Sequence, residues 1–196
     1  MRFDDAETPA PPETPTLQEV EVIDQEDAPI TFPARNRRQG RAWALQMIVQ
    51  ADLNPFVDVG MILSHFWEQQ WSYAQEKAHR DDAEPGKPRK VEPYPEERLA
   101  THQLKQFTED LVRGTLARRE AIDAAIARLC DNWSLDRLGV IERSLLRLAF
   151  YEMDWFGTPA PIVINEAVDL AKFFANEESG AFVNGVLDRH AHEKRA

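Results

Sequence analysis

Residues 141–174 read IERSLLRLAFYEMDWFGTPAPIVINEAVDLAKFF, and this stretch decides the fold. Its first half repeats apolar residues at steps of three and four, the spacing that gathers side chains on one face of a helix. These residues are Ile141, Leu145 and Leu148. The Gly157-Thr158-Pro159 tripeptide predicts the end of that helix, and Pro161 suits the first turn of the next one. The second helix is expected to bury Val163, Ala167, Leu170 and Phe174.

The same helical period continues outward from this stretch in both directions. Toward the N-terminus, one group of buried positions is expected to be Ala44, Leu45, Ile48 and Ala51, and another Leu104, Phe107, Leu111 and Thr115. A short helix follows, marked by Ile122, Ile126, Leu129 and Trp133. Toward the C-terminus, a break over 176–180 precedes a last helix that contains Phe182, Val183, Val186 and Leu187. Strand signals are scarce, so we expect an all-α compact bundle of about seven helices.

A further helix is predicted after residue 54. Asn54 followed by Pro55 is typical of a helix N-cap and first helical position. Phe56, Val59, Leu63 and Phe66 then recur at helical spacing. The sequence therefore predicts that this helix begins at Pro55 and buries Phe56.

Two segments lack helical periodicity. Residues 1–33 hold six prolines and nine acidic residues against one basic residue, so they contribute most of the formal net charge of −11 of the whole chain. Such a segment buries too little apolar surface to offset its ordering entropy, and we expect a disordered acidic tail. The proline-rich stretch at about 80–97 predicts a long loop within a single helical domain that spans 34–196.

Catalytic and metal-binding signatures are absent from the sequence. The eight glycines form no phosphate-binding loop, and no His-Glu-x-x-His motif occurs. A single cysteine, Cys130, excludes an intramolecular disulfide and is expected to pack as a small apolar residue. His190 and His192 lie two residues apart, which is poor geometry for a shared metal, and both are expected to be solvated. We expect no enzyme activity, no metal and no cofactor.

No targeting or membrane segment is apparent. The longest apolar stretches fall short of the roughly 20 residues of a membrane span. The N-terminus also lacks the charged-then-apolar order of a secretory signal. The sequence therefore predicts a cytoplasmic protein without a membrane partner.

One basic cluster stands out at the start of the first helix. Residues 35–41 read RNRRQGR, with four arginines and no acid. Planar guanidinium groups pair with phosphate oxygens and stack on unpaired bases. The cluster favours an RNA contact, although a solvated basic helix start would give the same pattern.

The C-terminal third carries a more specific signal. Residues 163–172 read VINEAVDLAK and residues 178–188 read ESGAFVNGVLD, and they follow ERSLLRLAFYEM at 142–153. These motifs, in this order, closely resemble the NusB family of bacterial transcription antitermination factors. GRAWALQ at 40–46 also fits the first helix of that family.

The resemblance implies a fold of two packed helical subbundles and a non-enzymatic function. Members of the family bind the single-stranded boxA element of leader RNA together with NusE, a ribosomal protein, within an RNA polymerase antitermination complex. By the same resemblance, the RNA-binding residues are Arg35, Arg37, Arg38 and Arg41. The expected partner-binding residues are Asp136, Glu142 and Glu178.

Two other functions stay open at this point. The arginines could contact an acidic protein, which would make the chain a helical scaffold or a homodimer. Alternatively, the chain could be the RNA-recognition module of an RNA methyltransferase system, since cytosine methyltransferases can carry a similar N-terminal domain. The absence of a Gly-rich cofactor motif counts against the second of these.

Gly185 has a separate, structural interpretation. A glycine inside a helix costs roughly 1 kcal/mol relative to alanine. This cost is tolerable if another helix backbone approaches the glycine closely.

Overall fold

The structure, a computed structural model, describes residues 36–81, 100–129 and 135–194. Within these ranges it consists of seven α-helices, a 3-10 turn and a π-helical turn, which confirms the predicted all-α bundle. The elements are α1 (Asn36–Leu53), α2 (Val59–Asp81), α4 (His102–Ala117), α5 (Arg119–Leu129), η1 (Leu135–Arg137), α6 (Val140–Tyr151), η2 (Glu152–Phe156), α7 (Ala160–Phe174) and α8 (Glu177–Glu193).

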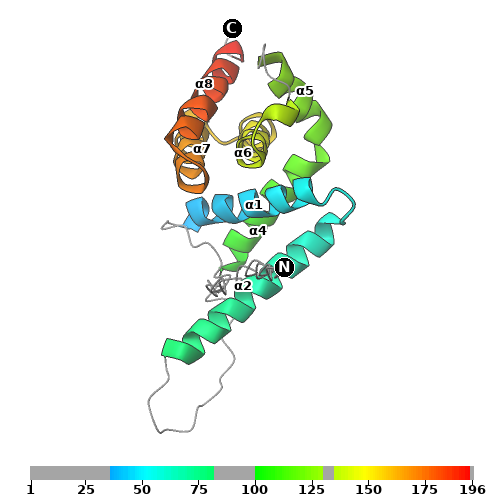
Figure 1. Cartoon of the computed structure of the whole chain (residues 1–196), viewed down its shortest axis with the longest axis vertical. Helices are drawn as coiled ribbons and strands as arrows, with labels where there is room; N and C mark the ends of the chain where they lie inside the picture. The colour runs from blue at the N-terminus through cyan, green and yellow to red at the C-terminus, as the bar shows by residue number, and fades with distance from the viewer. Residues whose placement is uncertain (1–35, 82–99, 130–134, 195–196) are drawn as a thin grey trace, which may run out of the picture.

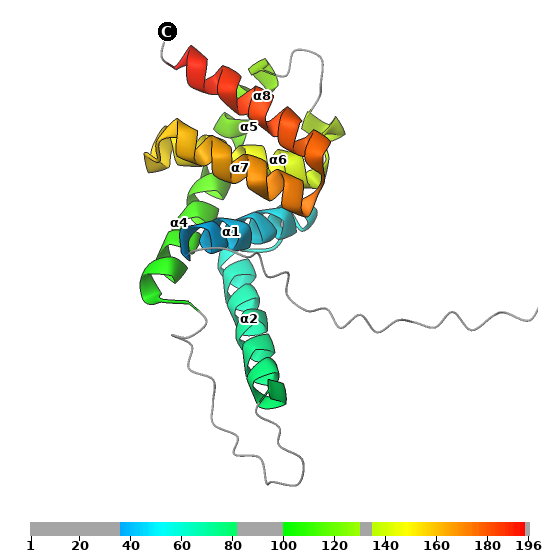
Figure 2. The same ribbon diagram turned by 90° about the vertical axis from the view of Figure 1, so that its left-hand side faces the viewer.

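Helix α1 joins two groups of helices (Figure 1). On one side it packs against α2 and α4, and on the other side it packs against α6. Helix α6 is in contact with α5, α7 and α8, which lie around it, and α7 and α8 run side by side (Figure 2). The first group thus consists of α1, α2 and α4, and the second of α5 to α8.

Helix α6 is the centre of the second group. Every residue from Ser144 to Tyr151 is buried. A helix that is buried on all sides must be surrounded by other elements, and α6 is in contact with α1, α4, α5, α7 and α8. The sequence 141–151 therefore determines the architecture through burial rather than through helix propensity.

The predicted buried faces are confirmed at most positions. The buried residues among those predicted include Ala44, Leu45, Ile48, Ala51, Leu104, Phe107, Leu111, Thr115, Ile122, Ile126, Leu129, Leu145, Leu148, Val163, Ala167, Leu170, Val183, Val186 and Leu187. Ile141, Phe174 and Phe182 are half-buried. The predicted stop after α6 is also confirmed, because Gly157 adopts a φ of 83° and ends η2.

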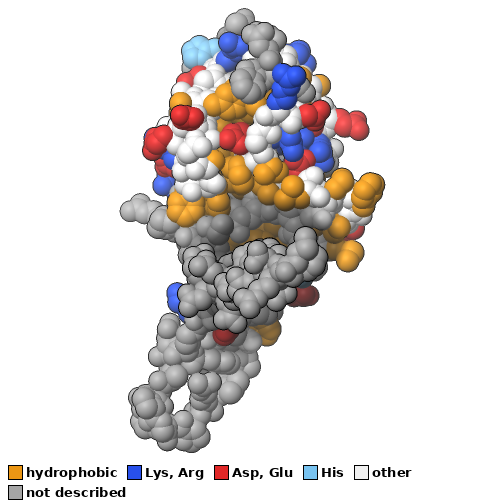
Figure 3. Space-filling view, viewed as in Figure 1, with side chains coloured by type: hydrophobic (Ala, Val, Ile, Leu, Met, Phe, Trp, Pro, Cys, Tyr) orange, Lys and Arg blue, Asp and Glu red, His pale blue; other side chains and the backbone are white. Residues whose placement is uncertain are grey.

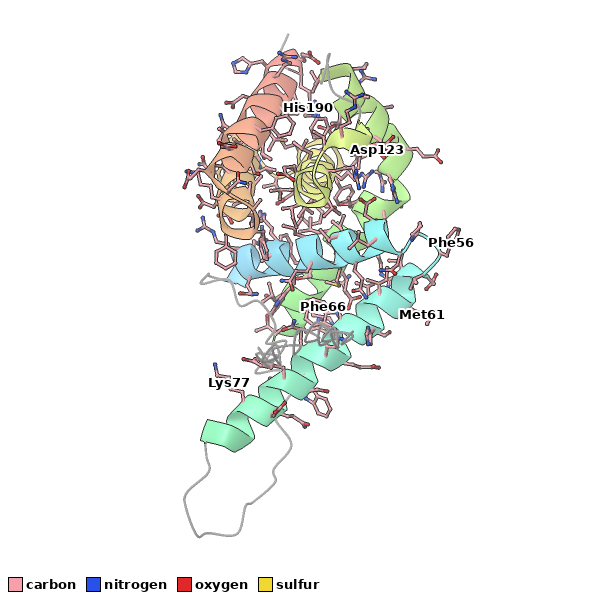
Figure 4. All side chains as sticks on the ribbon, in the orientation of Figure 1. Phe56, Met61, Phe66, Lys77, Asp123 and His190 are labelled. Atoms are coloured by element: carbon pink, nitrogen blue, oxygen red, sulfur yellow. The ribbon has the colours of Figure 1, made fainter. Side chains whose placement is uncertain are left out.

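The prediction for residues 54–56 was wrong. The Asn54 N–H donates to the carbonyl of Gln50, so Asn54 closes α1 instead of starting α2. Asp58 begins α2, since its carboxylate accepts a hydrogen bond of 2.7 Å from the Gly60 N–H. Phe56 lies in the intervening turn and is fully exposed, as Figure 4 shows.

Two further expectations are corrected. Gly185 is exposed, and nothing lies within 4 Å of where its Cβ would be, so no helix approaches it. His190 is buried against α6, where its ring stacks on Phe150 with the ring centroids 4.0 Å apart. The same ring forms a hydrogen bond with Asp154 of η2. His192 is exposed, as expected. Helix α8 begins at Glu177, so the predicted break over 176–180 is shorter than expected.

Several predictions fall outside the described residues. They concern the tail at 1–33, nearly all of the loop at 80–97, and the roles of Arg35, Cys130 and Trp133. Residues 80 and 81 belong to α2. The domain boundaries therefore stay predictions.

Candidate nucleic-acid interface

The arginines at the start of α1 have different environments. Arg37 is exposed, and its guanidinium carbon lies 5.2 Å from the centre of the Phe107 ring on α4. Among the described residues it has no carboxylate partner. Because a guanidinium stacked on a ring keeps its outer N–H donors available, Arg37 can pair with an anion from solvent.

Arg38 is held by two acids of α7. Its Nε and Nη2 donate to the two carboxylate oxygens of Glu166, each at 2.9 Å, and Nη2 lies 2.8 Å from Asp169. The hydrogen bonds from Arg38 to Glu166, together with both negative charges, raise the pKa of Arg38 above its ordinary value. The side chain is 34% exposed, so one part of it still faces water. Arg38 thus combines a structural ion pair with access to solvent.

Arg41 is a buried structural residue. It is 5% exposed and pairs with Glu152, which is 1% exposed. Its Nε lies 2.9 Å from one oxygen of Glu152, and Thr158 donates to the other at 2.9 Å. This geometry ties α1 to η2. The expected contact between Arg41 and RNA does not fit this burial, because the guanidinium is buried and paired with Glu152.

A second ionic cluster joins α1 to α5 and α6. Asp52, which is 3% exposed, accepts hydrogen bonds from Arg119 (2.8 Å), Arg143 (2.9 Å from Nε) and Arg147 (2.7 Å). Burial alone would raise the pKa of Asp52, but the hydrogen bonds and charges of Arg143 and Arg147 outweigh it, so the pKa lies below its ordinary value. Arg147 also pairs with Asp123. The sequence analysis did not find this cluster, because its members are far apart in the chain.

The three acids expected at a partner surface lie near the start of α6. Glu142, in the first turn of α6, accepts a hydrogen bond from the Ser179 hydroxyl, which brings it to the first turn of α8, the turn that also contains Glu178. Asp136 is exposed in η1, the turn that leads into α6. Arg143 anchors that turn by donating to the Leu135 carbonyl at 3.1 Å. The structure thus brings the segments of all three acids to one end of α6.

An exposed apolar turn, residues 53–61, lies at the C-terminal end of α1. Leu53, which follows Asp52, is 65% exposed, and Met61 is 67% exposed. Phe56 and Val57 lie exposed between them. Apolar side chains are visible at this edge of the molecule in Figure 3. Sequence reasoning missed the turn because it assigned Phe56 to a buried helical face.

Within the described ranges, no group of three or more His, Cys, Asp or Glu residues is arranged to hold a metal ion. No helix of the described part of the chain has the length and apolar character needed to cross a membrane.

Comparison with known proteins gives consistent matches. A family model described as the NusB family matches residues 38–192. The transcription antitermination protein NusB of Myxococcus xanthus is 38% identical over 156 residues, which cover 79% of this chain and 94% of that protein. NusB of Solibacter usitatus is 51% identical over 82 residues, and the chain spans only 56% of the length of that relative. A crystal structure of antitermination factors NusB and NusE in complex with dsRNA has a TM-score of 0.57 and 28% identity, and covers 79% of this chain and 95% of that one.

Proposed function

The chain belongs to the NusB family, and from this premise we propose that it is a non-enzymatic RNA-binding factor of transcription antitermination. It binds boxA-like single-stranded leader RNA together with a NusE-type ribosomal protein. This complex acts on RNA polymerase in the cytoplasm.

The observation that carries the proposal is the state of Arg37. It is exposed, is stacked on Phe107, and has no carboxylate partner among the described residues. Arg38 lies beside it with one third of its side chain in water. Arginine–phosphate contacts position a strand, whereas contacts to unpaired bases give sequence preference.

We assign different roles to the four arginines at positions 35–41. Arg37 and Arg38 are the proposed RNA contacts. Arg41 supports them from inside, because its pair with Glu152 fixes the start of α1 against η2. Arg35 is proposed as an RNA contact from the sequence alone.

The proposed protein partner docks at the N-terminal end of α6. The acids Asp136, Glu142 and Glu178 supply negative charge there, and the exposed turn 53–61 supplies apolar surface. Interfaces that combine an apolar centre with a charged rim are typical of specific protein complexes. The Asp52–Arg143 bond connects the two parts of this surface.

A gel-shift experiment tests the proposal. The probes are a boxA RNA, a scrambled RNA of equal composition and a duplex of the boxA sequence, each with and without the NusE-type protein. We expect the single-stranded boxA RNA to bind best and the partner to strengthen its binding. Equal binding of boxA and scrambled RNA in the presence of the partner would contradict the proposal.

A further inference from the structure

A second arginine shares the unusual state of Arg37. Arg118 is exposed at the C-cap of α4, and no described carboxylate pairs with it. Its guanidinium carbon lies 5.6 Å from the centre of the Tyr151 ring and 5.8 Å from that of Trp155. By contrast, several other arginines are paired with acids, and they include Arg38, Arg41, Arg119, Arg143 and Arg147.

Trp155 is a large aromatic side chain left partly in water. It lies in η2, the π-helical turn that follows α6, and it is 43% exposed. Its ring is nearly parallel to that of Tyr151, with an angle of 15° between the planes and 6.4 Å between the centres. π-Helical turns are often found at functional sites because they redirect side chains from the helical path.

A chain of ring contacts connects Arg37 to Arg118. Phe107, under Arg37, meets Phe156 at 5.6 Å, and Phe156 meets Tyr151 at 6.1 Å. Tyr151 in turn adjoins Trp155 and Arg118. Arg37 and Arg118, each placed over an aromatic ring and without a carboxylate partner in the described part of the chain, therefore lie at opposite ends of one series of aromatic contacts formed by α4, α6 and η2.

We propose that Trp155 and Arg118 form a second contact for the same RNA strand: an unpaired base stacks on the Trp155 ring, and Arg118 binds a neighbouring phosphate. This inference rests on the proposed function and extends it from the start of α1 to η2. Alternating aromatic rings and cations are the recurring means of binding single strands. The free positive charge favours a polyanion over an apolar peptide, and the exposed apolar turn 53–61 lies elsewhere on the molecule.

The test uses the full chain and a series of boxA RNAs. The first RNA of the series is the shortest one whose affinity depends on Arg37, and each longer RNA has one more nucleotide at either end. The variants are Trp155→Ala, Trp155→Phe and Arg118→Gln. Phe173→Ala is the matched control, because Phe173 is 44% exposed, and Arg128→Gln repeats the change of charge at an exposed site on α5.

We expect Trp155→Ala to weaken binding of the longer RNAs at least about fivefold, the low end for loss of one base–aromatic stack, and to leave the shortest RNA unaffected. Trp155→Phe keeps most of the affinity. Arg118→Gln makes the negative slope of log affinity against log salt concentration shallower by about 0.7, which is the value for one phosphate contact on a single strand. The two controls bind like the wild type. RNA that carries 5-iodouridine should also cross-link to Trp155.

The outcomes separate this inference from the proposed function. If Arg37→Gln weakens RNA binding while Trp155→Ala and Arg118→Gln bind every length like the wild type, the second contact is refuted and the proposed function stands. If Trp155→Ala instead weakens only the binding of the NusE-type protein, η2 is a protein interface. If the wild type binds no RNA of any length, both ideas fail.

Discussion

Arg41 and Glu152 form an ion pair in the interior of the protein, although 111 positions separate them in the chain. Their side chains are 5% and 1% exposed. The pair joins the start of α1, which carries the proposed RNA contacts, to η2, which carries Trp155 and Phe156. Its disruption should therefore affect the fold before it affects any ligand.

We predict that Arg41→Gln lowers the free energy of unfolding by about 3–5 kcal/mol, because it leaves the Glu152 carboxylate buried without its cation. The double variant Arg41→Met, Glu152→Met should be more stable than either single variant, since it removes both charges. Urea denaturation checks both expectations. A single variant as stable as the wild type would show that the pair does not hold α1 in place.

The Asp52 cluster predicts acid sensitivity. The pKa of Asp52 lies below its ordinary value of 3.8, so the cluster contributes its stability at pH values above about 4 and loses it as the pH falls toward the lowered pKa. Asp52→Asn should lower the free energy of unfolding by about 3 kcal/mol at pH 7. It should also reduce the further loss of stability between about pH 5 and pH 3. Glu193→Gln, at an exposed site on α8, controls for the change of net charge. Parallel pH profiles for Asp52→Asn and the wild type would contradict the assignment.

Two glycines inside helices should respond oppositely to alanine. At Gly114 a Cβ would lie 1.9 Å from the Tyr151 ring, so Gly114→Ala must displace that ring. This substitution should lower the free energy of unfolding by about 1–3 kcal/mol. At Gly185 a Cβ would meet nothing within 4 Å, so Gly185→Ala should stabilise α8 by up to about 1 kcal/mol. Thermal unfolding of the two variants distinguishes them. A gain of stability for Gly114→Ala would contradict the packing of Tyr151.

Helical spacing in the sequence was sufficient to predict most of the fold. Leu104, Phe107 and Leu111 were placed correctly because burial on one face of a helix depends only on residues three and four apart. The error at Phe56 arose where two local signals competed. Asn54-Pro55 resembles a helix start, but Asp58 supplies the N-cap bond that begins α2.

The candidate site was less accessible to sequence reasoning. Nothing near Arg41 in the chain indicates that its guanidinium is buried, because its partner Glu152 is distant in sequence. The same holds for His190, which has its partners on α6 and η2. One local signal was present: Glu166 and Asp169 are three residues apart on one helix, and both bind Arg38.

Removal of an acid partner of Arg38 should strengthen RNA binding, whereas most of the other substitutions should weaken RNA binding or lower stability. Asp169 is 46% exposed and adds a negative charge beside Arg38. Asp169→Asn should therefore raise RNA affinity about two- to fivefold at 50 mM salt, and the gain should shrink at 1 M salt, where charges are screened within about 3 Å. Filter binding at the two salt concentrations measures the effect, with Glu193→Gln as the control for net charge. A lower affinity of Asp169→Asn at low salt would mean that Asp169 orders Arg38 for binding.

The most direct test of the RNA-binding surface is a salt titration of boxA RNA binding by the wild type and by Arg37→Gln. The wild type should lose affinity with a slope of about −0.7 per phosphate contacted, and Arg37→Gln should bind more weakly with a slope shallower by about 0.7. Its unfolding should match that of the wild type, because Arg37 is exposed. Equal affinities and equal slopes for the two proteins would contradict the account.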